Sequence, residues 1–196
     1  MDRQLLHRAP EHFHTPRLRI EKIRIDHADA LRDAVHRAGD NWRFIEWAGQ
    51  GLWDREHAQM FCSMSRMAME QDGAVLSYVV SESRRDADPW PGRFVGMIDL
   101  HSFQPRHRHC QVGYVCDVAM QGRGLMREAV SAVVDLGLTR LQMQRIEAWC
   151  DPLNLRSIRF ARSLGFEPSE TLSWRRSDIV VLACEARRIP TIGAFA

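Results

Sequence analysis

The sequence predicts one domain of mixed α/β type, in which a sheet is flanked by helices. Short apolar runs bounded by turn residues, such as 75–80 and 145–150, are typical of strands. Apolar residues also recur at a spacing of three or four, as over 129–141, which indicates helices that bury one face. The chain has 196 residues, enough for one domain with a substantial core and too few for two.

The elements are predicted in order along the chain. Residues 18–23 alternate weakly and form the first strand. Asp26 is predicted to cap a helix that continues to about Arg37, and Asp54 to cap a second helix to about Gln71. Further strands are predicted at 75–80, 94–103, 109–118 and 145–150, with a closing hairpin at 169–174 and 179–184. Prolines, glycine and charges predict loops at 84–92 and 104–108.

Composition limits the classes of function. Residues 1–14 are polar and aperiodic and are predicted to be a loose lead-in, with residues 15–196 as the single domain. The net charge of +2 gives no strong field for nucleic acid. No apolar run is long enough to cross a membrane, and the first residues do not lead into a signal peptide's apolar core. The five cysteines form no C-x-x-C pair, so a reducing cytoplasm is expected.

A glycine-containing loop lies between the strand at 109–118 and the helix that follows it. Such a loop directs several free backbone N–H groups to one point, where the helix dipole adds partial positive charge. This arrangement predicts an anion site, most often for phosphate or pyrophosphate. The residues of the loop are Gln121, Gly122, Arg123, Gly124, Leu125, Met126 and Arg127.

A second group of residues, at 154–166, predicts a short helix, with residues typical of a helix start at one end and of a helix end at the other. Asn154 is a good N-cap, and Ser157 lies three residues later in the first turn. Gly165 suits the left-handed position after the helix, and Phe166 gives the apolar contact that accompanies it. Taken alone, these residues indicate a well-capped structural helix.

The order of these features resembles the GNAT superfamily of acyl-CoA N-acyltransferases. The family loop, Gln/Arg-x-x-Gly-x-Gly/Ala, is matched by Gln121 and Gly124, while Met126 departs from it. A Met at this position is similar to the subgroup that acetylates the N-termini of ribosomal proteins. The resemblance spans about residues 15–186, is strongest over 111–166, and includes Val112-Gly113-Tyr114, Thr15-Pro16-Arg17-Leu18 and residues 178–182.

The resemblance implies a three-layer GNAT-type fold, with a central, mostly antiparallel sheet splayed between residues 109–118 and 145–150 and helices on both faces. It also implies transfer of an acetyl group from acetyl-CoA to a primary amine by direct attack, without metal, and suggests a homodimer. Residues 121–127 would bind the CoA pyrophosphate and Asn154 the pantetheine arm. A backbone N–H near Cys116, Asp117 or Val118 would stabilise the oxyanion.

The catalytic residues are less clearly indicated. The tyrosine that many members use to assist the departing thiolate falls at Ala161 and is absent. The subgroup instead has a serine close to the CoA sulfur, which Ser157 matches, although Ser157 could be only a helix-start serine. For the general base, Glu147 lies two residues before the family position, and Glu46 lies in the tryptophan-rich segment. Glu147 could equally be a solvated strand charge.

Other residues have alternative interpretations. Cys116 could be a nucleophile, but direct transfer needs none and a lone strand cysteine is usually a small core residue. His107 and His109 are expected to share a strand face and could bind a metal with His101. No cysteine or carboxylate completes a ligand set, which favours a polar hairpin. Four aromatic residues could line an acceptor groove or plug the core: Trp42, Phe44, Trp47 and Trp53.

The acceptor favoured by the sequence is a protein N-terminal α-amine. An α-amine has a pKa near 7.7–8.0, so roughly one in seven is neutral at pH 7, against about one in 2,500 for lysine. An enzyme without a firm base therefore suits an α-amine. The alternatives are a small-molecule amine (polyamine, antibiotic or toxin), an aminoacyl-tRNA, or an acyl-CoA-binding regulatory domain with little activity.

Overall fold

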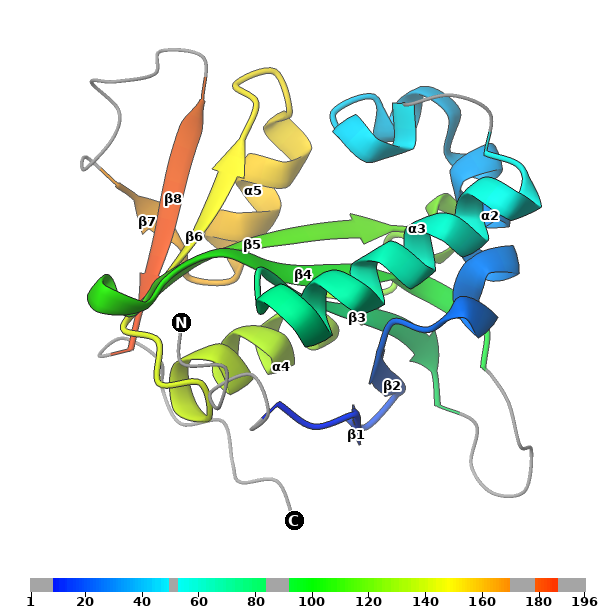
Figure 1. Ribbon diagram of the computed structural model, residues 1–196. Helices are drawn as coiled ribbons and strands as arrows, with labels where there is room; N and C mark the ends of the chain where they lie inside the picture. The colour runs from blue at the N-terminus through cyan, green and yellow to red at the C-terminus, as the bar shows by residue number, and fades with distance from the viewer. Residues whose placement is uncertain (1–8, 50–52, 84–91, 170–178, 187–196) are drawn as a thin grey trace.

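The computed structural model describes residues 9–49, 53–83, 92–169 and 179–186, and a mixed sheet lies at its centre (Figure 1). The strand order is β1-β2-β3-β4-β5-β6-β8-β7. Neighbouring strands pair antiparallel except β5 and β6, which are parallel. The strands are β1 (His12–His14), β2 (Leu18–Lys22), β3 (Val75–Glu82), β4 (Phe94–Gln104), β5 (His109–Cys116), β6 (Arg145–Cys150), β7 (Glu167–Pro168) and β8 (Val180–Glu185).

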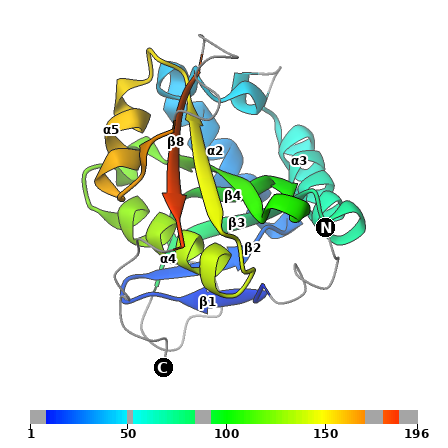
Figure 2. The ribbon, with the colours of Figure 1, turned by 90° about the vertical axis from the view of Figure 1, so that its left-hand side faces the viewer.

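Helices cover both faces of this sheet, as predicted. Helices α2 (Ala28–Ala38) and α3 (Arg55–Met67) pack on one face, and α4 (Leu125–Thr139) and α5 (Leu155–Ser163) on the other (Figure 2). Ile98 packs in the core with α4, whereas the preceding Met97 packs with α2 and α3, as the alternation of a strand requires. Short helical turns connect these elements: η1 (Ile25–His27), η2 (Gly39–Trp42), η3 (Glu46–Gly49), the π-helical η4 (Ala68–Asp72), η5 (Pro105–His107) and η6 (Val118–Met120).

The splay between β5 and β6 is confirmed. The two strands pair only at His109–Arg145, Cys110–Ile146 and Gln111–Glu147. Beyond these pairs β5 continues to Cys116 without β6 beside it, and the two strands diverge in Figure 1. This divergence opens the sheet at the point where the glycine loop begins.

The two predicted helix caps have different outcomes. Asp54 caps α3, because its carboxylate accepts a hydrogen bond from the His57 N–H at 2.8 Å. The prediction for Asp26 is wrong, because Asp26 lies inside η1 and α2 begins two residues later at Ala28. The buried side chain of His27 accepts the Arg24 N–H at 2.9 Å, which closes a tight turn before the helix.

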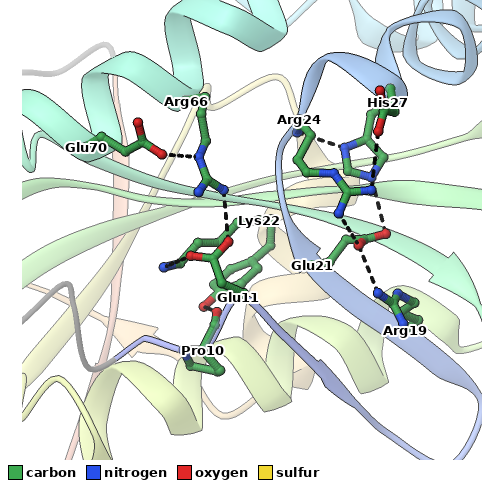
Figure 3. A network of polar contacts seen from close by, with 11 residues as sticks. Pro10, Glu11, Arg19, Glu21, Lys22, Arg24, His27, Arg66 and Glu70 are labelled. Carbon is green, nitrogen blue, oxygen red and sulfur yellow. Dashed lines mark hydrogen bonds and ion pairs between the residues drawn. The ribbon is translucent and has the colours of Figure 1, made fainter.

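A polar network explains why β1 forms within the predicted lead-in (Figure 3). Glu11, just before β1, pairs with Lys22 of β2 at 2.9 Å and with Arg66 of α3 at 3.0 Å. At the preceding position of β2, the buried carboxylate of Glu21 lies 3.3 Å from His27 and 3.2 Å from Arg19. These ion pairs hold the sheet edge against α3 and η1. The contacts of Glu11 with Lys22 and Arg66 join residues too far apart in sequence for local patterning to reveal.

The closing hairpin is described in part. β8 matches the predicted strand at 179–184, and β7 pairs with it at Glu167–Pro168. Most of the predicted strand at 169–174, like most of the predicted loop at 84–92, lies outside the described residues. His107 lies in η5 rather than on a strand beside His109.

Gly96 of β4 allows the sheet and α4 to approach each other closely. A Cβ atom at Gly96 would lie 2.2 Å from the Val115 carbonyl oxygen and 2.8 Å from Met126 Sδ. Val115 belongs to β5 and Met126 to the first turn of α4. Gly96 therefore sets the distance between the sheet and the glycine loop.

We expect Gly96→Ala to lower the free energy of unfolding by about 2 kcal/mol or more, because a methyl group would overpack this contact. Denaturant titration measures the loss. Gly49→Ala is the matched control, since a Cβ there meets nothing within 4 Å. Equal stability of the Gly96→Ala variant and the unchanged protein would contradict the close approach.

Candidate functional site

The glycine loop presents unsatisfied backbone N–H groups at the start of α4. Gly122 and Gly124 have φ values of 75° and 72°, which favour glycine. Gly124 is the N-cap and supplies no side-chain hydrogen bond, so the amides of Leu125, Met126 and Arg127 have no cap. A Cβ at Gly122 would meet nothing within 4 Å, so a ligand can approach the backbone there. The loop can therefore receive an anion.

Arg17 braces this loop from the N-terminal side of β2. Its Nε lies 2.6 Å from Glu128 Oε2, and its Nη1 donates to the Arg123 carbonyl at 3.0 Å. Thr15 also donates to Glu128, whose carboxylate is thereby paired rather than free to repel an anion. Burial alone would raise the pKa of Glu128, but the hydrogen bonds from Thr15 and Arg17 outweigh it and lower the pKa. No role was predicted for Arg17, whose partners lie more than 100 residues away.

A cavity of about 360 Å³ extends from the loop into the splay. It joins four segments: the glycine loop, the second half of β5, the start of α5 and the segment that follows α2. Its lining residues are Asn41, Trp42, Phe44, Ile45, Tyr114, Val115, Cys116, Met120, Gln121, Gly122, Gly124, Leu125, Met126, Arg127, Asn154, Arg156, Ser157 and Phe160.

At the end of β5, the structure distinguishes the three residues predicted to supply an oxyanion donor. The Asp117 N–H donates to Val95 of β4 at 2.9 Å. Because alternate residues face the same neighbouring strand, Cys116 directs its backbone away from β4, and its carbonyl accepts from Trp42 Nε1 at 3.0 Å. Cys116 lines the cavity, whereas Asp117 and Val118 do not. The Cys116 N–H is therefore the better placed candidate.

The Cys116 thiol is unsuited to nucleophilic attack. Burial raises its pKa to about 11, so it is protonated at neutral pH. The five cysteines are all free. These facts agree with the interpretation of Cys116 as a small core residue.

At the start of α5, Asn154 and Ser157 both reach the cavity. Asn154 Oδ1 accepts the Ser157 N–H at 3.1 Å, which confirms the predicted cap. The Ser157 hydroxyl lies 3.1 Å from the Tyr114 hydroxyl and 3.3 Å from Cys150 Sγ. Ala161, at the position of the family tyrosine, is fully buried in the core.

The four aromatic residues between α2 and α3 were expected either to line an acceptor groove or to fill the core, and both arrangements occur. Trp42 and Phe44 line the cavity. Trp47 and Trp53 pack instead on Phe61 of α3, with ring centroids 4.8 and 5.4 Å from that ring. Trp42 serves both purposes, because it lines the cavity and is also buried in the core cluster that contains Trp53.

Glu147 and Glu46 lie outside the cavity lining. Glu147 is buried on β6, where Arg145 Nε and Trp149 Nε1 each donate to its carboxylate at 2.8 Å. His109 Nε2 lies 3.1 Å from the same carboxylate. Burial alone would raise the Glu147 pKa, but these partners outweigh it and lower it to about 2. Such a carboxylate is a poor base, and its contacts indicate a structural role; Glu46 is exposed on η3.

Several cavity residues were not predicted to have a role in the site. The most consequential is Tyr114, which was noted only as part of a strand and of the Val112-Gly113-Tyr114 resemblance. Alternate residues of a strand point to the same face. The spacing of Tyr114 from Cys116 in the sequence therefore already indicated that both side chains lie on one face of β5. The others are Asn41, Ile45, Val115, Met120, Arg156 and Phe160. Arg123, predicted to bind, directs its side chain to Glu82 at 2.8 Å and does not line the cavity.

The described residues contain neither a candidate membrane span nor a candidate metal site. No helix there is both long and apolar enough to cross a membrane. No group of three or more histidine, cysteine, aspartate and glutamate side chains in that part of the chain is arranged to hold a metal ion.

Comparison with protein families gives one match that covers most of the chain. A family model described as an acetyltransferase (GNAT) domain matches residues 17–167. The probable N-acetyltransferase YjcK of Bacillus subtilis is 46% identical over 55 residues, which are 28% of this chain and 30% of that protein. The uncharacterized N-acetyltransferase p20 of Bacillus licheniformis is 23% identical over 167 residues, which are 80% of this chain and 83% of that protein.

Solved structures share the fold at low identity. A putative ribosomal-protein-serine acetyltransferase from Vibrio cholerae has a TM-score of 0.74 and 20% identity, over 89% of this chain and 97% of that chain. The ribosomal L7/L12 α-N-protein acetyltransferase RimL, in complex with coenzyme A, has a TM-score of 0.72 and 18% identity, over 87% of this chain and 95% of that chain.

If Glu147 is structural, Glu147→Gln should lower the free energy of unfolding by about 2 kcal/mol or more at neutral pH, because the Arg145 guanidinium loses its buried counter-charge. The folded pKa is about 2 against an ordinary 4.5. The stabilisation is therefore complete above pH 4.5 and is lost as the pH falls toward 2. Denaturant titrations at several pH values should show the difference between the two proteins shrinking in that window.

Glu185→Gln is the matched control for this test. Glu185 pairs with the same Arg145 at 3.2 Å, but its side chain is half exposed, so the expected loss is small. A Glu147→Gln variant of unchanged stability that has lost turnover would instead return Glu147 to the catalytic residues.

Proposed function

The chain belongs to the GNAT acetyltransferase family, and we propose that it acetylates the α-amine of a protein N-terminus. Membership makes the chain an acetyl-CoA-dependent N-acyltransferase.

One observation carries the choice of acceptor. None of the described residues that line the cavity is aspartate, glutamate or histidine. A site without such a base suits an amine that is already neutral in part at the working pH. Roughly one α-amine in seven is neutral at pH 7, against about one lysine in 2,500. The structural neighbours whose names refer to ribosomal-protein serine and to an α-N-protein support the same acceptor.

In the proposed reaction, the uncapped amides of α4 hold the CoA pyrophosphate, and Arg17 keeps the loop in place through the Arg123 carbonyl. The neutral amine attacks the thioester carbonyl carbon. The Cys116 N–H, directed into the splay, donates to the oxyanion. The carbon–sulfur bond then breaks, and the Ser157 hydroxyl donates a hydrogen bond to the departing sulfur. Asn154 supports Ser157 as well as the pantetheine arm.

Gly124→Asp should weaken CoA binding at least about tenfold, because a carboxylate would lie beside the pyrophosphate. Gly124→Asn is the matched control, since asparagine has nearly the same shape, tolerates positive φ and carries no charge. Isothermal titration calorimetry measures both. Equal affinity of the two variants for CoA would show that no anion binds at this loop.

The acceptor is tested with a panel of amines and acetyl-CoA, read by mass change. Peptides with a free N-terminus should be acetylated there, and the same peptides with a blocked N-terminus should not. Below the pKa of the α-amine the rate should rise about tenfold per pH unit, because the neutral form is the nucleophile. Acetylation confined to internal lysine would refute an α-amine acceptor.

The same panel includes a polyamine, an aminoglycoside and an aminoacyl-tRNA. Turnover of one of these without any peptide product would replace the proposed acceptor. Tight CoA binding without product on any amine would indicate a regulatory domain. The homodimer and the cytoplasmic location stay predictions from the sequence.

A further inference from the structure

We propose that Tyr114 and Cys150 are positioning residues, which direct the single hydroxyl hydrogen of Ser157 at the sulfur of the acyl donor. The inference rests on the proposed function and adds two side chains to its leaving-group site. Neither residue was predicted to have this role.

The three side chains come from three elements that meet at the splay. Tyr114 lies on β5, Cys150 ends β6, and Ser157 lies in the first turn of α5. The Tyr114 hydroxyl is 3.1 Å from Ser157 Oγ and 3.3 Å from the Ser157 carbonyl oxygen, and Cys150 Sγ is 3.3 Å from Ser157 Oγ. The Tyr114 ring packs on Phe160 with centroids 4.9 Å apart. The hydroxyl of Ser157, which lines the cavity, therefore has two polar neighbours, the Tyr114 hydroxyl and the Cys150 thiol.

The number of hydrogen atoms decides what this cluster can do. A serine hydroxyl has one hydrogen to donate and two lone pairs that accept. When Tyr114 and Cys150 both donate to Ser157 Oγ, both lone pairs are occupied. The hydroxyl hydrogen then has no acceptor among these two neighbours and is available to a ligand atom in the cavity.

Both neighbours keep their hydrogens at neutral pH. Burial raises the pKa of the Tyr114 phenol and that of the Cys150 thiol, each in spite of the hydrogen bond with Ser157. The Tyr114 hydrogen could instead go to the Ser157 carbonyl oxygen, at the longer distance of 3.3 Å. Negative charge on the departing sulfur favours a series of hydrogen bonds in which Tyr114 donates to Ser157 and Ser157 donates to the sulfur, because each donor polarises the next.

The step is one of hydrogen bonding rather than proton transfer. As the carbon–sulfur bond breaks, its electron pair goes to the sulfur, and the Ser157 hydroxyl stabilises the thiolate. The new amide nitrogen loses its proton to water, and the sulfur gains a proton from water when CoA leaves. A thiol is a stronger acid than an aliphatic hydroxyl, so Ser157 stays protonated throughout.

The test measures the thiol of bound CoA and needs no acceptor. Ultraviolet titration of the CoA complex gives the thiolate fraction at fixed pH below the thiol pKa. We expect Ser157→Ala to lower that fraction at least about tenfold, the effect of one hydrogen bond to a charged atom. Tyr114→Phe should lower it by a smaller factor, about twofold to tenfold, because it removes a hydrogen bond to the neutral Ser157 hydroxyl. The double variant should resemble Ser157→Ala alone, because Tyr114 acts through Ser157. Cys150→Ala should lower the fraction, and Cys150→Ser should retain more of it.

Controls separate positioning from packing. Tyr114→Phe keeps the ring that contacts Phe160. Tyr78→Phe removes another buried tyrosine hydroxyl, which donates to the Pro10 carbonyl at 2.9 Å and does not line the cavity. It should lower stability without changing the thiolate fraction. The other titratable groups among the described cavity residues are Cys116, Arg127 and Arg156.

The outcomes distinguish this inference from the proposed function. An equal thiolate fraction in Tyr114→Phe and the unchanged protein, or an undiminished effect of Tyr114→Phe in the Ser157→Ala background, would overturn the inference. Identical results for Cys150→Ala and Cys150→Ser would remove Cys150 from it. The expected fractions with no amine acetylated would overturn the proposed function alone, and failure to bind CoA would overturn both.

Discussion

The separation of β5 from β6 is the constraint on which the rest of the site depends. After three paired residues the strands part, and within the described part of the chain no strand pairs with that side of β5 beyond Gln111. Unpaired backbone groups in a protein interior need other partners. The indole of Trp42 takes one of them, the Cys116 carbonyl. The Cys116 N–H faces the same opening, so the gap that the fold must fill is also the place where a donor to an oxyanion is available.

The glycine loop and its brace follow from the same opening. Parallel neighbours need a crossover, and α4 provides it, so this helix begins where β5 ends at the mouth of the splay. Gly96 lets α4 lie close against β4 and β5, and Arg17 ties the loop to the start of β2. The N-terminal segment thus supports the donor half of the site, while the segment around Trp42 forms the opposite wall. Both helical layers contribute to one cavity.

The features that the sequence predicts well are local. The glycine loop, the caps at Asp54 and Asn154 and the strand positions depend on spacings within a few residues, and the structure matches them closely. The contacts that were not predicted join distant residues, such as Tyr114 with Ser157 and Arg17 with the Arg123 carbonyl. Register and packing set these contacts, and no single stretch of sequence encodes them. Asp26 was misplaced for a local reason, because the buried side chain of His27 accepts the Arg24 N–H and closes a turn there.

Amide hydrogen exchange with and without CoA tests the central claim most directly, because it reports each backbone N–H group separately. If the splay and the loop form the donor site, CoA should slow exchange at Cys116 and at Leu125, Met126 and Arg127. Exchange in the centres of α2 and α3 should stay unchanged. Binding of CoA that left those four amides unprotected, or that protected only residues elsewhere, would contradict the account.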